Sequence, residues 1–224
     1  MEGKGGRIIK ADIKPSKDEL ETARGLVSEA LEKAESELPR KEDYTVSLGW
    51  TEQDFVLERM DGTSGRAHSA HFFEIMFNTR AEKWKDAIKS TAVHEYAHTW
   101  HYEKRYDAEG RNDVVWQYVI DEALTQNFAE KVFDHTPDHR EEHSKEEIAE
   151  YWPEIRDDEL EREFENIAWP YSLYINKSEE GYPNWLGYSM SYLIGKKLLE
   201  KHELENFPEL GKSDVIKAGN QLFT

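Results

Sequence analysis

The sequence predicts an α+β protein that is mostly helical and carries one small sheet. Apolar residues recur at helical spacing over residues 16–38, and this period is lost over residues 43–77, where short apolar runs alternate with glycine-containing turns. The helical period returns from residue 79 and continues almost to the end of the chain. Because 38% of the 224 residues are hydrophobic, the chain can fill one core, and we expect a single domain over residues 1–224.

The amino-terminal part is predicted to hold one helix and three short strands. Ser16 and Glu19 form a capping box that begins the helix, and Pro39 ends it. Turns at Asp61-Gly62 and Ser64-Gly65 separate the apolar runs that follow. The predicted strands are residues 44–48, 55–57 and 72–77.

The rest of the chain is predicted to be helical. A capping box of Thr79 and Glu82 begins a helix that runs to about Glu103. Another box, Ser144 with Glu147, begins a charged helix that Pro153 interrupts. The predicted helices are residues 79–103, 113–133, 144–168 with its interruption, 184–202 and 213–222.

The charge and residue composition exclude several classes of function. Because 47 acidic residues outnumber 29 basic ones, the net charge is −18, which disfavours binding to nucleic acid or to an anionic membrane. The chain has no cysteine, so a metal site must use His, Asp or Glu. No long apolar run or secretion signal is found, and we expect a soluble, cytoplasmic protein. If the active cleft shares the acidic charge, basic peptides are the favoured substrates.

The most informative motif is His94-Glu95-Tyr96-Ala97-His98, which has the pattern His-Glu-x-x-His. On a helix, residues four apart share a face, so the two histidines can bind one metal ion. Neutral imidazoles leave the charge of zinc intact, and an adjacent glutamate can take a proton from a bound water. The motif therefore predicts a zinc site with Glu95 as the general base, although other divalent metals stay possible.

A catalytic zinc usually has a third protein ligand, and three residues are candidates. Glu122 lies on an otherwise apolar stripe of the next helix, where a carboxylate is costly unless it is paired or bound to a metal. Asp121 has a shorter side chain and is better suited to orienting a ligand histidine. His101 follows His98 on much the same face, but three histidines within two turns of one helix converge poorly. Glu122 is the favoured third ligand.

Peptide hydrolysis also needs a hydrogen-bond donor for the oxyanion, and a late helix supplies tyrosines. Tyr188 is the first candidate and Tyr192 the second, since both lie on one stripe of the helix predicted after Asn184. The other histidines have different expected places. His68 and His71 are expected to flank the third strand or face the substrate, whereas His135, His139 and His143 lie in an acidic loop and are expected to be solvated.

These motifs resemble the zincin metallopeptidases of the gluzincin kind and, more closely, a domain family of predicted zinc-dependent proteases of largely unassigned function. In that family the third-ligand helix reads Glu-Gly-Leu-Ala, and here the matching residues are Glu122-Ala123-Leu124-Thr125. A later Gly-Tyr-x-x-Gly-Tyr matches Gly187-Tyr188-Ser189-Met190-Ser191-Tyr192, so that Ala123 and Ser191 replace two glycines. The resemblance covers roughly residues 40–222.

The resemblance implies a zincin-like fold with the small sheet packed on the motif helix, one zinc ion and hydrolysis of peptide bonds. By analogy, the strand over residues 72–77 would pair at its edge with an extended peptide substrate. The alternative function is a catalytically inactive zincin-fold binding protein that uses its metal structurally, and a zincin that hydrolyses another bond is a further possibility. An intact Glu95 favours the enzyme, because a structural site has no use for a general base.

Overall fold

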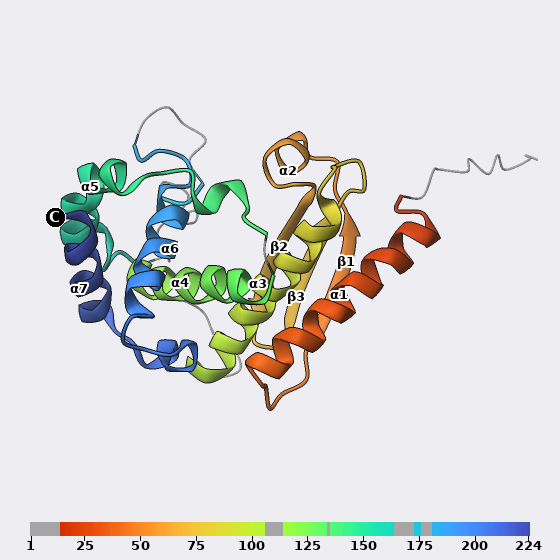
Figure 1. The fold of residues 1–224 in the computed structure, drawn as a ribbon, viewed down its shortest axis with the longest axis horizontal. Coiled ribbons are helices and arrows are strands. Elements are labelled where there is room, and N and C mark those ends of the chain that lie inside the picture. Colours follow the sequence, from red (N-terminus) through yellow and green to blue (C-terminus); the bar gives the residue numbers. More distant parts are fainter. Residues whose placement is uncertain (1–13, 106–113, 134, 164–172, 176–180) are drawn as a thin grey trace, which may run out of the picture.

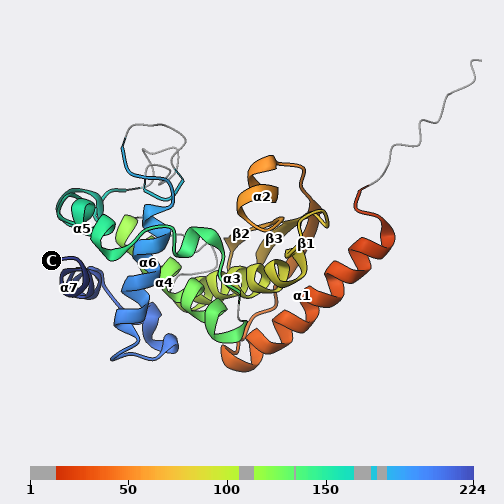
Figure 2. The same cartoon turned by 45° about the horizontal axis from the view of Figure 1, so that its top comes forward.

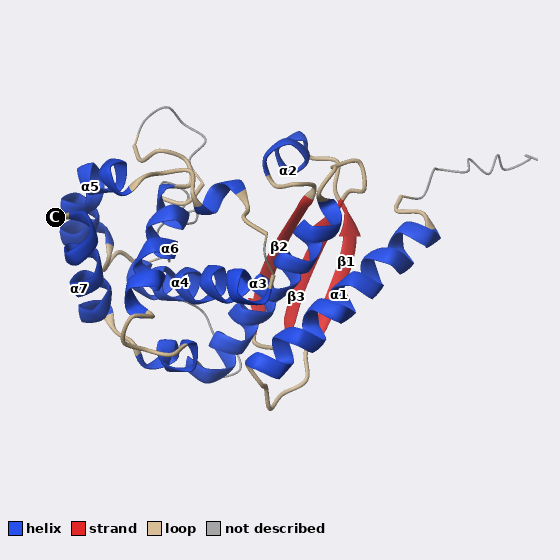
Figure 3. Ribbon diagram, in the orientation of Figure 1, coloured by secondary structure: helices blue, strands red, loops and turns tan. Residues whose placement is uncertain are grey.

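The computed structural model describes residues 14–105, 114–133, 135–163, 173–175 and 181–224. The protein is mostly helical and has one three-stranded sheet, which confirms the predicted α+β class (Figures 1 and 3). The elements in chain order are α1 (Lys17–Glu37), β1 (Thr45–Trp50), α2 (Asp54–Arg59), β2 (Thr63–Ser69), β3 (Phe72–Phe77), α3 (Trp84–Arg105), α4 (Val115–Val132), η1 (Asp138–Arg140), α5 (Lys145–Glu154), η2 (Ile155–Glu159), α6 (Leu186–Leu198), η4 (Leu204–Glu209) and α7 (Lys212–Phe223).

The sheet has the strand order β1-β3-β2 and is covered on one face by α1 and α3, which lie side by side (Figure 1). β1 pairs parallel to β3, and β2 pairs antiparallel to it. Alternate side chains of β3 are buried, namely Phe73, Ile75 and Phe77. Helix α3 packs directly on β2 and β3, so the small sheet does lie on the motif helix as expected.

Two predictions for the sheet were wrong. Residues 55–57 belong to helix α2 rather than to a strand, because a three-residue apolar run carries no period that separates the two structures. Strand β2 was missed, since its sequence Thr-Ser-Gly-Arg-Ala-His-Ser lacks the large β-branched and aromatic residues typical of strands. The strand is determined by its antiparallel pairing with β3 and not by its own residue types. The turn at Asp61-Gly62 is confirmed, with a positive φ at both residues. The turn predicted at Ser64-Gly65 was wrong, because both residues lie inside β2 and pair with β3.

Two predicted helix boundaries also differ. Helix α3 begins at Trp84, five residues later than predicted, because the hydroxyl of Thr79 donates to Glu19 on α1 instead of capping a helix. Helix α5 includes Pro153 in its last turn and passes directly into the π-helical η2. The continuation predicted to Ala168 lies partly outside the described residues.

The carboxy-terminal helices lie beyond α4, on the side away from the sheet (Figure 2). Helix α4 packs against α3 on one side and against α6 on the other. Gly195 permits the second contact, because a Cβ there would lie 2.7 Å from the backbone oxygen of Ala123. Helix α4 is therefore packed between the motif helix and α6. Within the described residues, no helix combines the length and the hydropathy needed to cross a membrane.

Candidate metal centre

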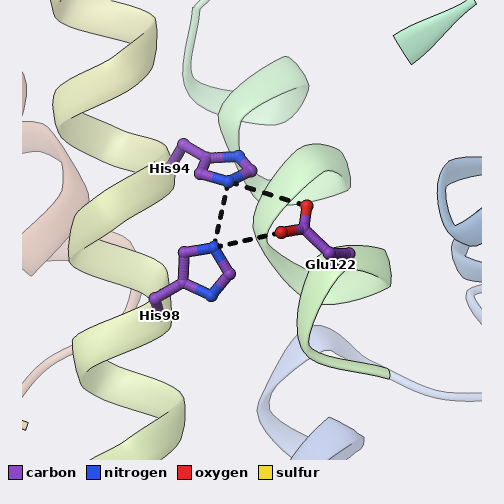
Figure 4. A group of neighbouring side chains, drawn as sticks. All are labelled: His94, His98 and Glu122. Carbon is purple, nitrogen blue, oxygen red and sulfur yellow. Dashed lines mark hydrogen bonds and ion pairs between the residues drawn. The ribbon is translucent and has the colours of Figure 1, made fainter. Parts of the chain in front are cut away.

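His94 and His98 on α3 face Glu122 on α4, and the three side chains converge on one point (Figure 4). The Nε2 atoms of the two histidines are 3.0 Å apart. Oxygens of Glu122 lie 3.7 Å from Nε2 of His94 and 3.5 Å from Nε2 of His98. The structure thus brings together all three residues predicted to bind a metal.

The donor set fits a zinc ion. Ligand atoms about 2.0–2.2 Å from a tetrahedral zinc lie roughly 3.3–3.6 Å from one another, close to the three separations found here. Two imidazoles and one carboxylate are the ligand types of a catalytic zinc that keeps one position open. The side chains of His98 and Glu122 are buried, whereas that of His94 is 18% exposed, so the group is accessible from the His94 side.

The electrostatics of the two histidines differ because their neighbours differ. Burial lowers the pKa of His94 to about 3, so its ring is neutral at neutral pH. Burial also opposes a charge on His98, but the carboxylates of Asp121 and Glu122 outweigh it and raise the pKa of His98 well above its ordinary value. In the metal-free protein His98 therefore holds a proton that a metal must displace.

Asp121 and His101, the rival third ligands, lie behind the group rather than in it. One oxygen of Asp121 is 2.8 Å from Nδ1 of His98, and the other is 2.8 Å from Nδ1 of His101. A carboxylate on Nδ1 directs Nε2 of His98 toward the metal position. Gln126, which the sequence did not single out, donates to Glu122 at 3.4 Å and to the backbone oxygen of Tyr188 at 3.1 Å. It orients the carboxylate of Glu122.

Glu95 is buried beside the group and packs beneath β2. A Cβ added to Gly65 would lie 2.5 Å from Oε1 of Glu95, so only glycine leaves room for this carboxylate under the strand. The backbone N–H of Ala67 also bonds to it. Burial, together with the nearby Glu122, raises the pKa of Glu95 to about 7, which suits a group that accepts and returns protons near neutral pH.

His94 and Glu95 open onto a pocket between β2 and the carboxy-terminal helices. Aromatic side chains line its far side, among them Phe55, Trp185 and Tyr188. Tyr188, the first candidate for the oxyanion, is therefore placed in the same pocket as the motif. The second candidate, Tyr192, has its hydroxyl engaged elsewhere, since it donates to Glu130 at 2.8 Å.

The prediction that His135, His139 and His143 are solvated was wrong, because all three are partly buried. His139 and His135 line the pocket, and the ring of His139 packs 4.9 Å from that of Tyr188. Burial lowers the pKa of His139 to about 4, and its Nδ1 has no hydrogen-bond partner. The only sequence signal was the density of three histidines within nine residues. The segment is packed on α6 by a bond from its backbone to Ser189.

The two histidines before the third predicted strand lie outside the pocket. Nε2 of His68, in β2, is 3.1 Å from Glu74 on β3. Nδ1 of His71, in the turn after β2, is 3.2 Å from the backbone oxygen of Asp43. His71 thus flanks β3 as expected, whereas His68 lies within β2.

Fold and site together define a class: an α+β protein in which two histidines and a glutamate can hold a metal ion beside a buried carboxylate. The chain belongs to the family described as predicted Zn-dependent protease (DUF2268), whose model matches residues 24–216. The match includes the motif, Glu122 and Tyr188, and it identifies zinc as the metal for this group. No curated protein and no solved structure matches the chain significantly.

Proposed function

We propose that the protein is a zinc peptidase of the gluzincin type, with His94, His98 and Glu122 as its metal ligands and Glu95 as its general base. The observation that carries this proposal is the position of Glu95. Its carboxylate is buried beside the convergent ligands, lies on the same pocket and is left out of the ligand group. A purely structural metal site would close with a fourth protein ligand and would need no such base.

A bound zinc ion would supply the Lewis acidity that makes water nucleophilic near neutral pH. Glu95 then accepts the proton of the attacking water and returns it to the leaving amine. A general base works best when its pKa lies near the operating pH, and burial brings that of Glu95 to about 7. Asp121 keeps His98 oriented, and Gln126 does the same for Glu122.

Tyr188 is the proposed donor to the oxyanion of the tetrahedral intermediate. Tyr188 lines the pocket together with His94 and Glu95, and its ring packs against Tyr174, with ring centres 5.0 Å apart. A hydroxyl held on a packed ring is preorganised, so it stabilises developing charge without a reorganisation cost.

The expected edge contact of strand β3 with a peptide substrate was wrong, because β3 is the central strand and pairs on both sides. In its place we propose β2, whose Ser64 and Gly65 line the pocket. β2 is the outer strand on that side of the sheet in the described part of the chain. An extended peptide on its edge would run across the metal ligands.

The test compares the zinc-loaded wild-type protein with Glu95→Gln on a mixed library of quenched fluorescent peptides. Because the amide keeps the shape of the side chain but cannot take the proton, we expect full zinc content and a loss of turnover of roughly 10²–10⁴-fold. Glu103→Gln is the matched control, since Glu103 lies on the same helix and is partly buried, but pairs with Arg40 and does not line the pocket. It should keep its activity. Equal turnover by wild type and Glu95→Gln would refute the mechanism, and no cleavage at all would favour the binding-protein alternative.

A further inference from the structure

A buried arginine lines the candidate active-site pocket. Arg140, at the end of η1, is only 2% exposed, yet it shares this pocket with His94 and Glu95. It was not singled out by its sequence context, a short loop without period between Pro137 and Ser144. A buried guanidinium is costly unless carboxylates or other acceptors compensate for its charge.

The protein compensates for this charge only in part. The nearest carboxylate oxygen, Oε1 of Glu130, is 4.0 Å from Nη2 of Arg140. That same oxygen accepts the hydroxyl of Tyr192 at 2.8 Å and lies 3.5 Å from Nζ of Lys196. Nη2 of Arg140 donates to the hydroxyl of Thr136 at 2.6 Å, and the guanidinium carbon lies 5.0 Å from the ring centre of Tyr192, whereas Nε has no hydrogen-bond partner. By contrast, carboxylates that pair fully with arginine commonly accept two parallel hydrogen bonds.

The charge of Arg140 affects the pKa values of two histidines in the pocket. Burial and, next to it, Arg140 lower the pKa of His139 to about 4. Burial is also the main cause that lowers the pKa of His135, with Arg140 among the smaller causes. Both imidazoles are therefore neutral at neutral pH. Among the described residues that line the pocket, Arg140 is thus the one cation, and Glu95 is the one acidic side chain.

We propose that Arg140 binds a carboxylate of the substrate, supplied either by the carboxy terminus of a peptide or by an Asp or Glu side chain. This inference rests on the proposed peptidase function and adds its substrate class. The substrate carboxylate would neutralise the charge of Arg140, which Glu130 at 4.0 Å neutralises only in part. The net charge of −18 would favour basic peptides as substrates. Arg140 in the pocket would instead favour peptides that carry a carboxylate.

The test measures binding to the zinc-loaded Glu95→Gln protein, which cannot turn the probes over. Three acetylated tetrapeptides serve as probes: one with neutral side chains and a free carboxy terminus, its amidated twin, and an amidated peptide with one glutamate. At least one carboxylate peptide should bind about 10- to 100-fold more tightly than the neutral amide. Whichever of the two does so identifies the source of the carboxylate.

A second substitution, Arg140→Gln, should remove this difference and leave the affinity for the neutral amide unchanged. The control is Arg24→Gln, which changes the net charge equally at an exposed position on α1 and should preserve the difference. Glu130→Gln covers the case in which Arg140→Gln does not fold. It removes the competing carboxylate while its amide oxygen can still accept from Tyr192, so it should tighten binding of the carboxylate peptide.

Three results would overturn the proposal: equal or unmeasurable binding of all three peptides, a difference that persists in folded Arg140→Gln, or a Glu130→Gln protein that binds carboxylates no better. Failure of the peptidase function is seen separately, as absent zinc binding or absent cleavage of any library peptide by the wild type.

Discussion

Helix α3 contributes to two buried polar clusters, one around Arg40 and one around His94. Arg40 lies 3.2 Å from Glu103 and donates to the hydroxyl of Thr99 and the backbone oxygen of Ala70. Glu103 in turn accepts from the backbone N–H of Lys41 at 3.2 Å. Two opposite charges thus lie 3.2 Å apart, so the charge of this cluster is paired without any ligand.

The cluster around His94 has the opposite character. The Nε2 atoms of its two imidazoles lie 3.0 Å apart and face the carboxylate oxygens of Glu122, so three possible metal ligands converge on one point. The two clusters on one helix thus differ in arrangement: the Arg40 cluster pairs a cation with a carboxylate, whereas the His94 cluster turns three possible ligands toward one point. That difference separates a structural ion pair from a site built for a metal. The predictions below test it, beginning with the largest effect.

Loss of a ligand should have the largest effect. Glu122→Ala removes one of three protein ligands, and we expect the protein to lose its zinc. Asp121→Asn leaves the ligand group intact and disturbs only the orientation of His98, so zinc affinity should fall by about 10- to 100-fold. Zinc content after gel filtration and a competition titration measure the two effects. The reverse ranking would transfer the ligand role to Asp121.

Arg40→Gln should affect stability and leave the metal site unchanged. The substitution removes the charged partner of the partly buried Glu103, which keeps Lys104 and the N–H of Lys41, so we expect a loss of about 1–3 kcal/mol of unfolding free energy. Urea unfolding of the metal-free protein measures the loss, and zinc stoichiometry should stay at that of the wild type. A folded Arg40→Gln protein without zinc would contradict the separation of the Arg40 cluster from the metal site.

Gly65→Ala should reduce catalysis without loss of metal. The added methyl group would lie 2.4 Å from Cγ of Glu95, so the carboxylate must shift from its place under β2. A displaced general base lowers kcat, and we expect a decrease of roughly tenfold to 100-fold with zinc content unchanged. Gly25→Ala is the matched control, because nothing lies within 4 Å of its added methyl group. Undiminished kcat in Gly65→Ala would mean that the place of Glu95 under the strand is not required.

The smallest effect concerns protons. Since the pKa of His98 is raised in the metal-free fold, its charged form adds stability that is present below the unfolded pKa of about 6.5 and is lost as the pH rises through the folded pKa. Zinc competes with this proton, so binding at pH 7 should release about one proton from His98 and a fraction more from Glu95. Calorimetry in two buffers of different ionisation enthalpy measures the number of protons released on zinc binding. Asp121→Asn should release fewer protons than the wild type. No proton release by the wild type would contradict the assigned charge of His98.

The sequence predicted those parts of the site that local spacing determines. His94, Glu95 and His98 follow from one helical turn, and Glu122 from a carboxylate on an apolar stripe of the next helix. Gly65, His139 and Arg140 could not be found in this way. Gly65 belongs to a strand formed by pairing with β3, and the other two lie in a loop whose path depends on packing against α6.

Dependence on contacts between distant parts of the sequence also explains the errors in the predicted fold. The capping boxes that begin α1 and α5 were predicted correctly because their signals are local. The strand order was not predictable, because placing β3 in the centre depends on a β2 strand that has almost no strand signal of its own.

The most direct test of the account is anomalous diffraction at the zinc edge from crystals of the zinc-loaded protein. We predict one strong peak about 2.0–2.2 Å from Nε2 of His94, Nε2 of His98 and a carboxylate oxygen of Glu122, with the Arg40 cluster free of any peak. A peak on Asp121 and His101, or no peak on α3 in fully zinc-treated crystals, would contradict it.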